Sequence, residues 1–307
     1  MSQSSSSVPS SPIILALPGN EARARAIAGA LPGEAGTLTI RRFPDEESYI
    51  RVESPVADRD AMLVCTLDRP DDKVLQVLFL AATLRELGAA RIGLIAPYLA
   101  YMRQDRRFTS GEAVTSVDFA RLLSGAVDWL VTVDPHLHRR SSLAEIYTIP
   151  TKVIHAAPFM AAWIRANVSR PVLIGPDSES AQWVGAVARS IDAPFTVLNK
   201  TRRGDRDVSV SIPDVDQWKT HTPVLVDDII STARTMIETV GHLRRAGLAA
   251  PVCVGVHPVF AADAYDALLA SGPERVVTCN TISHPSNGID LSGELAATAG
   301  TLLGQPV

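Results

Sequence analysis

The chain has 307 residues and a formal net charge of −4, and because a typical domain has ~100–200 residues, two domains are favoured. The negative balance, without any dense block of lysine and arginine, argues against nucleic acid as the main partner. No apolar stretch approaches the ~20 residues of a membrane span, so we expect a cytoplasmic protein that binds no membrane.

Residues 1–12, MSQSSSSVPSSP, are rich in serine and have no apolar centre. A secretory signal needs such a centre, so we expect a disordered leader. Cys65, Cys253 and Cys279 each lie singly inside an apolar run. This pattern predicts buried structural thiols, with neither a disulfide framework nor a zinc site.

Short β-rich runs alternate with helical stretches along the rest of the chain. The expected strands are 13–17, 61–67, 91–97, 129–134, 172–177, 223–228, 251–257 and 275–279. The expected helices are 20–31, 71–88, 115–125, 158–167, 178–191, 235–247 and 261–271. Continuously apolar strands separated by helices predict parallel sheets covered on both faces, and there are enough strands for two sheets. We place the domain boundary at 149–158, where two prolines bracket a short extended piece.

The N-terminal half carries two polar segments that allow two interpretations, nucleotide binding and subunit contact. RRFPDEESYIRV (41–52) joins Phe43 to three acids in a turn, and PYLAYMRQDRRFTSGE (97–112) is a long loop that carries Arg103 and Gln104. An aromatic ring with a carboxylate could hold an adenine, while arginine and glutamine reach phosphates. Such loops also make subunit contacts, and spacing alone leaves both interpretations open.

Acids, a histidine and a lysine follow several expected strands. Asp134 ends the run 129–134 and His136 follows it, Asp177 ends 172–177, and Lys200 comes after FTVLN. Ligands of open α/β sheets bind beyond the carboxyl ends of the strands. A histidine and one carboxylate suit Mg²⁺ when phosphate oxygens complete its shell. The strand ends therefore predict a phosphate and metal site.

The segment NKTRRGDRDV (199–208) places Lys200 and Arg202 in an expected basic loop that contains a glycine. A solvated surface loop is the plain interpretation. Phosphoryl transfer, however, requires cations that meet the charge on the transferring group. We favour this second interpretation because the cations begin where a strand ends.

The stretch VLVDDIISTARTM (224–236) is the most informative one in the chain. An apolar run ends in Asp227 and Asp228, and small hydroxyl residues lead into a helical pattern. We expect a buried strand, a short loop and a helix N-terminus, which presents N–H groups to a phosphate. The two carboxylates can hold a sugar diol or a metal, so this loop predicts a sugar-phosphate site.

Six segments, in register along the chain, resemble the ribose-phosphate diphosphokinases (phosphoribosyl pyrophosphate synthetases): RRFPDEES, PYLAYMRQDRR, TVDPH, GPDS, NKTR and VLVDDIISTARTM. The resemblance runs from about Ile13 to near Leu302 and leaves the leader outside. The K-T-R form and the segment RRFTSGEAVTS look more like the archaeal-type branch of the family.

The resemblance implies an α/β protein with two tandem phosphoribosyltransferase-like domains, each a mainly parallel sheet flanked by helices, and an active site between them. Residues 13–154 would form the ATP side, and 155–307 the ribose 5-phosphate side with the catalytic loop. The last helix is a candidate to pack back on the N-terminal domain.

The implied reaction transfers the β,γ-diphosphoryl group of MgATP to the C1 hydroxyl of ribose 5-phosphate. The products are phosphoribosyl pyrophosphate, which feeds nucleotide biosynthesis, and AMP. In this family the ATP site borrows a loop from a neighbouring subunit, which implies a homo-oligomer, a dimer or a multiple of dimers.

The resemblance also assigns residues. Lys200 and Arg202 would stabilise the transferring group, and His136 and Asp177 would hold Mg²⁺. The ATP-binding residues would be Phe43, Asp45, Glu46, Glu47, Arg103 and Gln104. The residues for ribose 5-phosphate would be Arg202, Asp227, Asp228, Ser231, Thr232, Ala233, Arg234 and Thr235.

The chain departs from the family pattern in three places. Ala233 and Arg234 replace two glycines of the phosphate loop, Glu46 replaces a glycine, and GPDSES lacks the glycines that often follow the aspartate. Glycine permits positive φ and a close approach of backbone to phosphate. Either the loop takes ordinary dihedral angles, or its anion contact is looser and the Arg234 guanidinium compensates. We favour the second hypothesis.

Two alternatives remain at the level of sequence. A phosphoribosyltransferase would use the same DD loop but needs neither a paired domain nor the RRFPDEES and RQDRR segments. A catalytically weak or silent homologue would regulate an active synthetase. The presence of Lys200, Arg202 and His136 speaks against it, while the altered 232–235 loop keeps it open.

Overall fold

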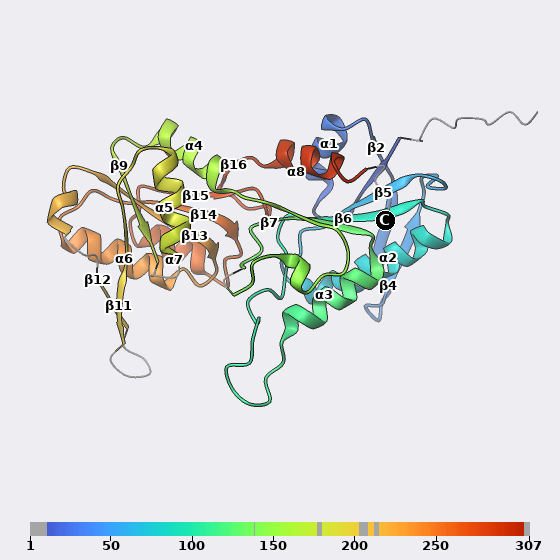
Figure 1. The fold of residues 1–307 in the computed structure, drawn as a ribbon, viewed down its shortest axis with the longest axis horizontal. Helices are drawn as coiled ribbons and strands as arrows, with labels where there is room; N and C mark the ends of the chain where they lie inside the picture. The colour runs from blue at the N-terminus through green and yellow to red at the C-terminus, as the bar shows by residue number, and fades with distance from the viewer. Residues whose placement is uncertain (1–10, 138, 177–179, 203–207, 212–214, 304–307) are drawn as a thin grey trace, which may run out of the picture. The chain divides into compact units, whose positions relative to one another are not determined.

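The computed structural model describes residues 11–137, 139–176, 180–202, 208–211 and 215–303. The chain divides into two compact units, whose elements are labelled in Figure 1. Unit 1 contains the residues up to Ile154 together with the segment from Ser292 onward, and unit 2 runs from His155 to Leu291. Within the described residues, no helix combines the length and apolar character needed to cross a bilayer.

Unit 1 is built on a six-stranded sheet in which all neighbouring strands are parallel. In spatial order its strands are β2 (Glu34–Ala35), β1 (Ile13–Ala16), β5 (Asp60–Val64), β6 (Arg91–Ala96), β7 (Trp129–Val133) and β8 (Thr151–Ile154). Its helices are α1 (Glu21–Ala30), α2 (Val74–Glu86), α3 (Thr115–Ala126) and α8 (Ser292–Gly300). Two short 3₁₀ helices, η1 (Pro70–Asp72) and η2 (Leu143–Glu145), lie in its loops.

Helices cover both faces of this sheet (Figure 1). Alternate residues of each strand, such as Leu63 and Leu94, join one core cluster with the apolar sides of α2 and α3. The intervening residues, such as Met62, are equally buried on the other face, where α1 packs against α8. Burial on both faces explains why the strands are continuously apolar in sequence.

Unit 2 repeats this plan with a second parallel six-stranded sheet. In spatial order its strands are β10 (Phe195–Val197), β9 (Pro171–Gly175), β13 (Thr222–Ile230), β14 (Val252–Pro258), β15 (Arg275–Cys279) and β16 (Asn287–Ile289). Its helices are α4 (Ala157–Asn167), α5 (Ala181–Ser190), α6 (Arg234–Arg245) and α7 (Ala264–Ala270), with η3 at Val215–Trp218. The predicted architecture of two α/β units, each a parallel sheet flanked by helices, is confirmed.

Each unit also carries a two-stranded antiparallel hairpin, which in chain order comes between the second and third strands of its sheet. In unit 1 the hairpin is β3 (Leu38–Arg42) with β4 (Ser48–Val52), and in unit 2 it is β11 (Asn199–Arg202) with β12 (Val208–Ser211). The turn expected within 41–52 is present at 43–47, between β3 and β4. In the segment 199–208, expected as a loop, residues 199–202 instead form β11, and 203–207 lie outside the described residues. Cross-strand pairing makes these segments regular: Lys200 is opposite Val210 in one hairpin, and Ile40 is opposite Ile50 in the other.

The three cysteines are free and buried, as predicted. Burial raises the pKa of the Cys65 thiol and of the Cys253 thiol to about 12 in each case. Because the thiolate is the reactive form of cysteine, both side chains are inert at neutral pH.

Candidate active site

The two adjacent aspartates of unit 2 lie inside a strand and not beyond its end. β13 continues to Ile230 because β14 goes on pairing with it, through Ile229 opposite His257, after the pairing with β9 has stopped at Leu225. The expected strand end at Asp228 was thus two residues short. Successive side chains of a strand point to opposite faces, so Asp227 and Asp228 address different sides of the sheet.

The loop that follows β13 turns through a left-handed residue. Ala233 has φ 55° and ψ 6° and stands at the N-cap of α6, which begins at Arg234. The hypothesis of ordinary dihedral angles is therefore wrong at Ala233, which takes the conformation that glycine adopts most easily. Ala233 is buried and belongs to the core cluster of unit 2 that also contains Ile230 and Met236. Packing holds this strained backbone in place.

Backbone hydrogen bonds fix the start of the same loop. Phe260 N donates to Ile230 O at 2.9 Å, and Ala261 N donates to Ser231 O at 3.1 Å. Beside the loop, Asp227 and Thr235 line one small cavity of about 10 Å³, which is close to the space that one water needs. The first turn of α6 contains no acidic residue. A rigid loop, an exposed hydroxyl residue at Thr232 and an uncompensated positive helix end suit an anion.

In unit 1 the β3–β4 hairpin brings together the first four predicted ATP-binding residues at its tip. Phe43 N donates to Glu47 O at 2.8 Å and Glu46 N donates to Phe43 O at 2.9 Å, which closes the turn. Glu46 has φ 70°, so it too occupies a left-handed position where the family pattern has glycine. Asp45 Oδ1 accepts from Glu47 N at 3.3 Å.

The aromatic ring at this tip is open to solvent on part of its surface. Phe43 is 40% exposed, and its ring packs edge-on against Tyr49 at 5.9 Å between centroids. The Arg41 guanidinium lies 4.8 Å from the Phe43 ring and 4.2 Å from the Tyr49 ring. The same guanidinium thus contacts both rings and holds them in place. The tip therefore presents a fixed aromatic surface beside carboxylates.

Two further loops of unit 1 carry the remaining predicted residues of that unit. Arg103 is exposed, and the carbonyl of Gln104 accepts from Ser116 N, at the start of α3, at 3.3 Å. After β7 the chain turns sharply, with φ 29° at Asp134 and φ 56° at His136, and His136 N donates to Asp134 O at 2.8 Å. Non-glycine residues in this region are strained, and such strain clusters at functional sites.

Three predicted residues cannot be placed by their side chains. Asp177 lies outside the described residues, and for Lys200 and Arg202 only the backbone, in β11, is described. Among the side chains that are described, no group of three histidines, cysteines or acids comes close enough to hold a metal ion. A single imidazole at His136 leaves most of a Mg²⁺ shell to phosphate oxygens and water, which is the coordination that Mg²⁺ favours.

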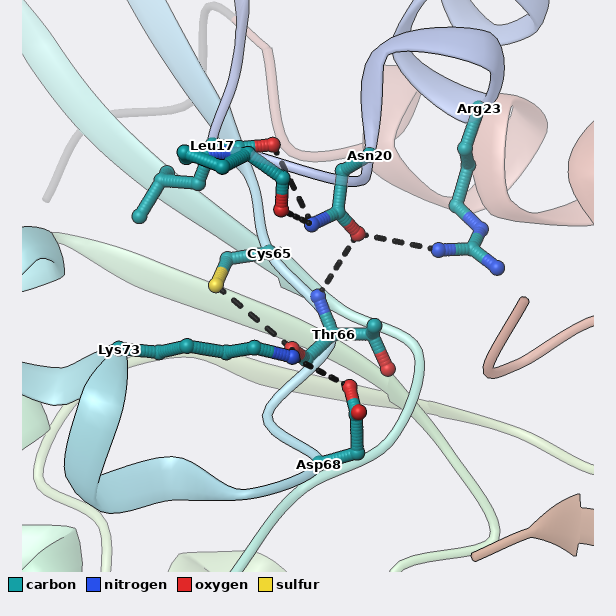
Figure 2. A network of polar contacts seen from close by, with 8 residues as sticks. Leu17, Asn20, Arg23, Cys65, Thr66, Asp68 and Lys73 are labelled. Atoms are coloured by element: carbon teal, nitrogen blue, oxygen red, sulfur yellow. Dashed lines mark hydrogen bonds and ion pairs between the residues drawn. The ribbon is translucent and has the colours of Figure 1, made fainter. Parts of the chain in front are cut away.

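A buried polar network in unit 1 was missed at the level of sequence (Figure 2). The Asn20 amide, 2% exposed, accepts from Thr66 N at 3.0 Å and from the Arg23 guanidinium at 3.1 Å. It also donates to the carbonyl of Leu17 at 3.3 Å. This amide ties the end of β1 to the segment after β5. Thr66 is 46 positions away from Asn20, so no local motif in the sequence indicates this contact.

Lys73 closes the same network from the start of α2. Its Nζ donates to Asp68 Oδ1 at 2.5 Å and to Thr66 O at 3.0 Å. Both charged side chains are about three-quarters covered, at 22% and 24% exposed. The Lys73 ammonium and the Asp68 carboxylate therefore neutralise each other within the β5–α2 segment.

His257, whose role the sequence left open, is buried in β14. Its Nδ1 lies 3.0 Å from Thr281 Oγ1, and that hydroxyl donates to Val256 O at 3.0 Å. These contacts within the interior of unit 2 favour a packing role.

Comparison with known proteins decides the family. Residues 13–126 match the family model for the N-terminal domain of ribose phosphate pyrophosphokinase, and residues 142–292 match the phosphoribosyl transferase domain. A ribose-phosphate pyrophosphokinase of Saccharolobus solfataricus is 34% identical over 244 residues, which cover 78% of this chain and 83% of that protein. The chain belongs to the ribose-phosphate pyrophosphokinase family.

Other members of the ribose-phosphate pyrophosphokinase family match along nearly the whole chain. The Methanothermobacter thermautotrophicus protein is 30% identical over 92% of this chain and 98% of its own length. A ribose-phosphate pyrophosphokinase 1 of Streptococcus pyogenes is 28% identical over 89% of this chain and 86% of its own length. The predicted likeness to archaeal members is confirmed. The phosphoribosylpyrophosphate synthetase of Mycobacterium smegmatis shares the fold, with a TM-score of 0.84 at 24% identity over 95% of this chain and 98% of that one.

Proposed function

We propose that the protein transfers the β,γ-diphosphoryl group of MgATP to the C1 hydroxyl of ribose 5-phosphate. The observation that carries this proposal is the β13–α6 junction, where two carboxylates, a packed left-handed turn and a helix N-terminus follow one another within 227–234. Such a junction suits a molecule with hydroxyls at one end and a phosphate at the other. Ribose 5-phosphate has that form.

In the proposed step, the oxygen of the C1 hydroxyl attacks the β-phosphorus of ATP. The bond between that phosphorus and the oxygen that bridges the α- and β-phosphates breaks, AMP leaves, and the hydroxyl proton passes to solvent. Negative charge spreads over the transferring group during such a displacement. Lys200 and Arg202 supply the opposing charge, Lys200 as a point cation and Arg202 as a bidentate fork that also contacts the sugar phosphate.

Each substrate is assigned its own residues. Asp227 and Asp228 bind the ribose hydroxyls, and the loop from Ser231 to Thr235 binds the 5-phosphate, with the Arg234 guanidinium as an added anion contact. The exposed Phe43 ring and the carboxylates at 45–47 bind the adenosine, supported by the fixed geometry of the hairpin tip. Arg103 and Gln104 contact the ATP phosphates.

His136 and Asp177 hold Mg²⁺, and its shell is completed by phosphate oxygens and water. The metal, when bound, neutralises charge on the polyphosphate. The donor set fits this ion because one imidazole and one carboxylate leave room for the oxygens of a nucleotide. Chelation of Mg²⁺ by EDTA should abolish turnover, and added Mg²⁺ should restore it.

One assay tests the proposal. Purified protein is incubated with MgATP and ribose 5-phosphate, and AMP is followed over time by chromatography. We expect AMP and phosphoribosyl pyrophosphate in equal amounts, and no AMP when ribose 5-phosphate is left out. A folded protein that releases no AMP at any phosphate or Mg²⁺ concentration would favour the silent homologue.

We further infer a cytoplasmic homo-oligomer in which a second copy covers an apolar face of unit 1. Large side chains are half exposed along α2 and α3: Leu75 at 56%, Phe79 at 50% and Leu122 at 53%. A shallow groove between the same helices is bordered by Arg85 and Glu86, and α3 adds exposed Asp118 and Arg121. Equal numbers of both charges let this face pair with its own copy about a two-fold axis. Light scattering should show a dimer or larger for the parent and a smaller species for Phe79→Glu, and a monomeric parent contradicts the inference.

A further inference from the structure

An ion pair joins the two loops of unit 1 that carry Gln104 and His136. The Arg139 guanidinium lies 3.2 Å from each carboxylate oxygen of Asp105. The Asp105 side chain is only 6% exposed, against 37% for Arg139. Arg140 Nη2 also donates to the backbone carbonyl of Asp105 at 3.5 Å. A carboxylate this well covered needs its partner, because removal of one member leaves an uncompensated charge in a site of low dielectric constant.

Arg139 reaches a second feature of the first loop. Its guanidinium lies 5.5 Å from the centre of the Phe108 ring, while Arg106 lies 4.5 Å from the same centre. The Phe108 ring is therefore in contact with two cations, one from each loop. Arg139 thus holds the first loop at two points, the Asp105 carboxylate and the Phe108 ring.

The far end of the first loop is held by a carboxylate of its own. Glu112 accepts from Phe108 N at 2.7 Å and from Thr109 N at 3.0 Å. Arg107 Nε donates to Glu112 O at 2.8 Å. These backbone hydrogen bonds lower the pKa of Glu112, so it stays ionised at neutral pH. The loop is consequently a folded structure that can transmit a constraint applied at Asp105.

The second loop is braced in the same manner. Glu145 accepts from Ser141 N at 2.6 Å and from Ser141 Oγ at 2.8 Å, and it pairs with Arg140 at 3.6 Å. His136 lies three residues before Arg139, and Gln104 directly precedes Asp105. Both ends of the Asp105–Arg139 bridge are therefore embedded in braced segments next to the residues assigned to the nucleotide and its metal.

We propose that Asp105 and Arg139 are positioning residues that set the Gln104 loop and the His136 loop in register for MgATP. The proposal rests on the function proposed above for the assignment of the ligand, but the coupling between the loops stands on the contacts alone. Catalysis by positioning is sensitive to misplacement of about 1 Å, so loss of the bridge should weaken the handling of MgATP and spare the sugar phosphate.

Hydrogen–deuterium exchange of the full-length protein, without substrates, tests the coupling directly. We expect Asp105→Asn to speed exchange in peptides that cover 139–147, and Arg139→Gln to speed exchange in peptides that cover 103–112. The matched control is Asp216→Asn, in an exposed ion pair of unit 2 with Lys219 at 2.7 Å, which should leave both segments unchanged. Unchanged exchange in the opposite loop of both variants overturns the proposal.

Steady-state kinetics test the consequence for the ligand. We expect Asp105→Asn to raise the KM for MgATP about tenfold, with the KM for ribose 5-phosphate changed by less than about twofold. The double variant Asp105→Asn/Arg139→Gln should be no worse than the poorer single variant, because both changes break one bridge. Additive losses, or an equal rise in both KM values, overturn the proposal. A parent that makes no AMP refutes the proposed function alone, since the exchange experiment still decides the coupling.

Discussion

The two hairpins occupy the same place in the two units and carry opposite kinds of side chain. In chain order, each hairpin comes between the second and third strands of a parallel sheet. The β3–β4 hairpin presents Phe43 and acids at its tip, whereas the β11 strand of the other hairpin contains Lys200 and Arg202. A duplicated topology therefore provides two equivalent arms, and the chemistry of each arm depends on a few residues. In our proposal one arm binds a nucleoside and the other stabilises transferring charge.

The segments after the third strands differ in the same sense. In unit 2 the β13–α6 loop offers hydroxyls and a helix end that no acid in the first turn neutralises. In unit 1 the β5–α2 segment is closed by Lys73, Asp68 and the buried Asn20 amide (Figure 2). The β13–α6 loop suits a ligand, whereas the polar groups named in the β5–α2 segment already have partners within unit 1. In our proposal, the same position in the fold serves binding in unit 2 and stability in unit 1.

The largest expected effect separates the two arms. Lys200→Ala should lower kcat by about 10³-fold or more, because charge stabilisation of a transferring phosphoryl group is worth that much. KM values should change far less, and the measurement is the initial rate of AMP release at saturating substrates. Arg51→Ala, an exposed residue on the unit 1 hairpin, is the control and should keep kcat. A small kcat effect at Lys200 would erase the distinction between the arms.

The next effect separates the two loops by stability. Asn20→Ala should lower the free energy of unfolding by about 2–3 kcal/mol, because it leaves buried donors and acceptors unpaired. Thr235→Ala in unit 2 should change stability by less than about 0.5 kcal/mol and instead raise the KM for ribose 5-phosphate. Urea unfolding and steady-state kinetics measure both quantities. If Asn20→Ala were as stable as the parent, the β5–α2 segment would not be the structural counterpart that we describe.

A smaller effect sharpens the role of the unit 1 arm. Phe43→Ala should raise the KM for ATP about tenfold, since base stacking on an aromatic ring contributes about 1–3 kcal/mol. The kcat should stay within about threefold of the parent, because binding that is equal in ground and transition states changes KM alone. Phe43→Tyr keeps the ring and should restore the parent KM. A loss confined to kcat would place Phe43 with Lys200 in the chemical step.

The smallest effect concerns backbone strain shared by the two units. Ala233→Gly and Glu46→Gly should each stabilise the protein by about 0.5–1 kcal/mol, because left-handed strain of about 1–2 kcal/mol outweighs the backbone entropy of glycine. The control is Ala246→Gly at the other end of α6, where φ is −80°, and it should destabilise. Thermal unfolding measures all three. Destabilisation by Ala233→Gly would mean that loss of its buried methyl group outweighs the strain.

The sequence predicted the sheets well because their signal is local. Runs such as 91–97 are apolar throughout, and burial on both faces requires this pattern. The hairpins escaped because their strands, such as Leu38–Arg42, are short. The core contacts of Leu38 and Ile40 in unit 1 also depend on residues far along the chain. The length of β13 depends on its partner β14, whose paired residues lie 28 positions further along the chain, as in Ile229 opposite His257. Register with a distant strand is invisible to a pattern read along one segment.

The candidate site divides in a similar way. Residue types and their order indicated a candidate site near the ends of apolar runs, and the roles of its residues stay predictions. The structure places Asp227 and Asp228 inside β13 and the backbone of Lys200 and Arg202 in β11. The left-handed turn at Ala233 could not be predicted from sequence, since it depends on burial in a core cluster that also contains Ile230 and Met236. Nor could the sequence predict the Asp105–Arg139 bridge, whose members are 34 positions apart. Charges at such separations pair only when the intervening strands have folded.

Helix α8 belongs to unit 1 although it is the last helix of the described chain. Its residues Leu295, Ala296 and Ala299 are buried, and it packs against α1 near the start of the chain. During synthesis, this layer of unit 1 is therefore complete only after all of unit 2 has been made and α8 has left the ribosome. Until then α1 lacks its neighbour, so the nascent chain carries an uncovered apolar surface that chaperones recognise.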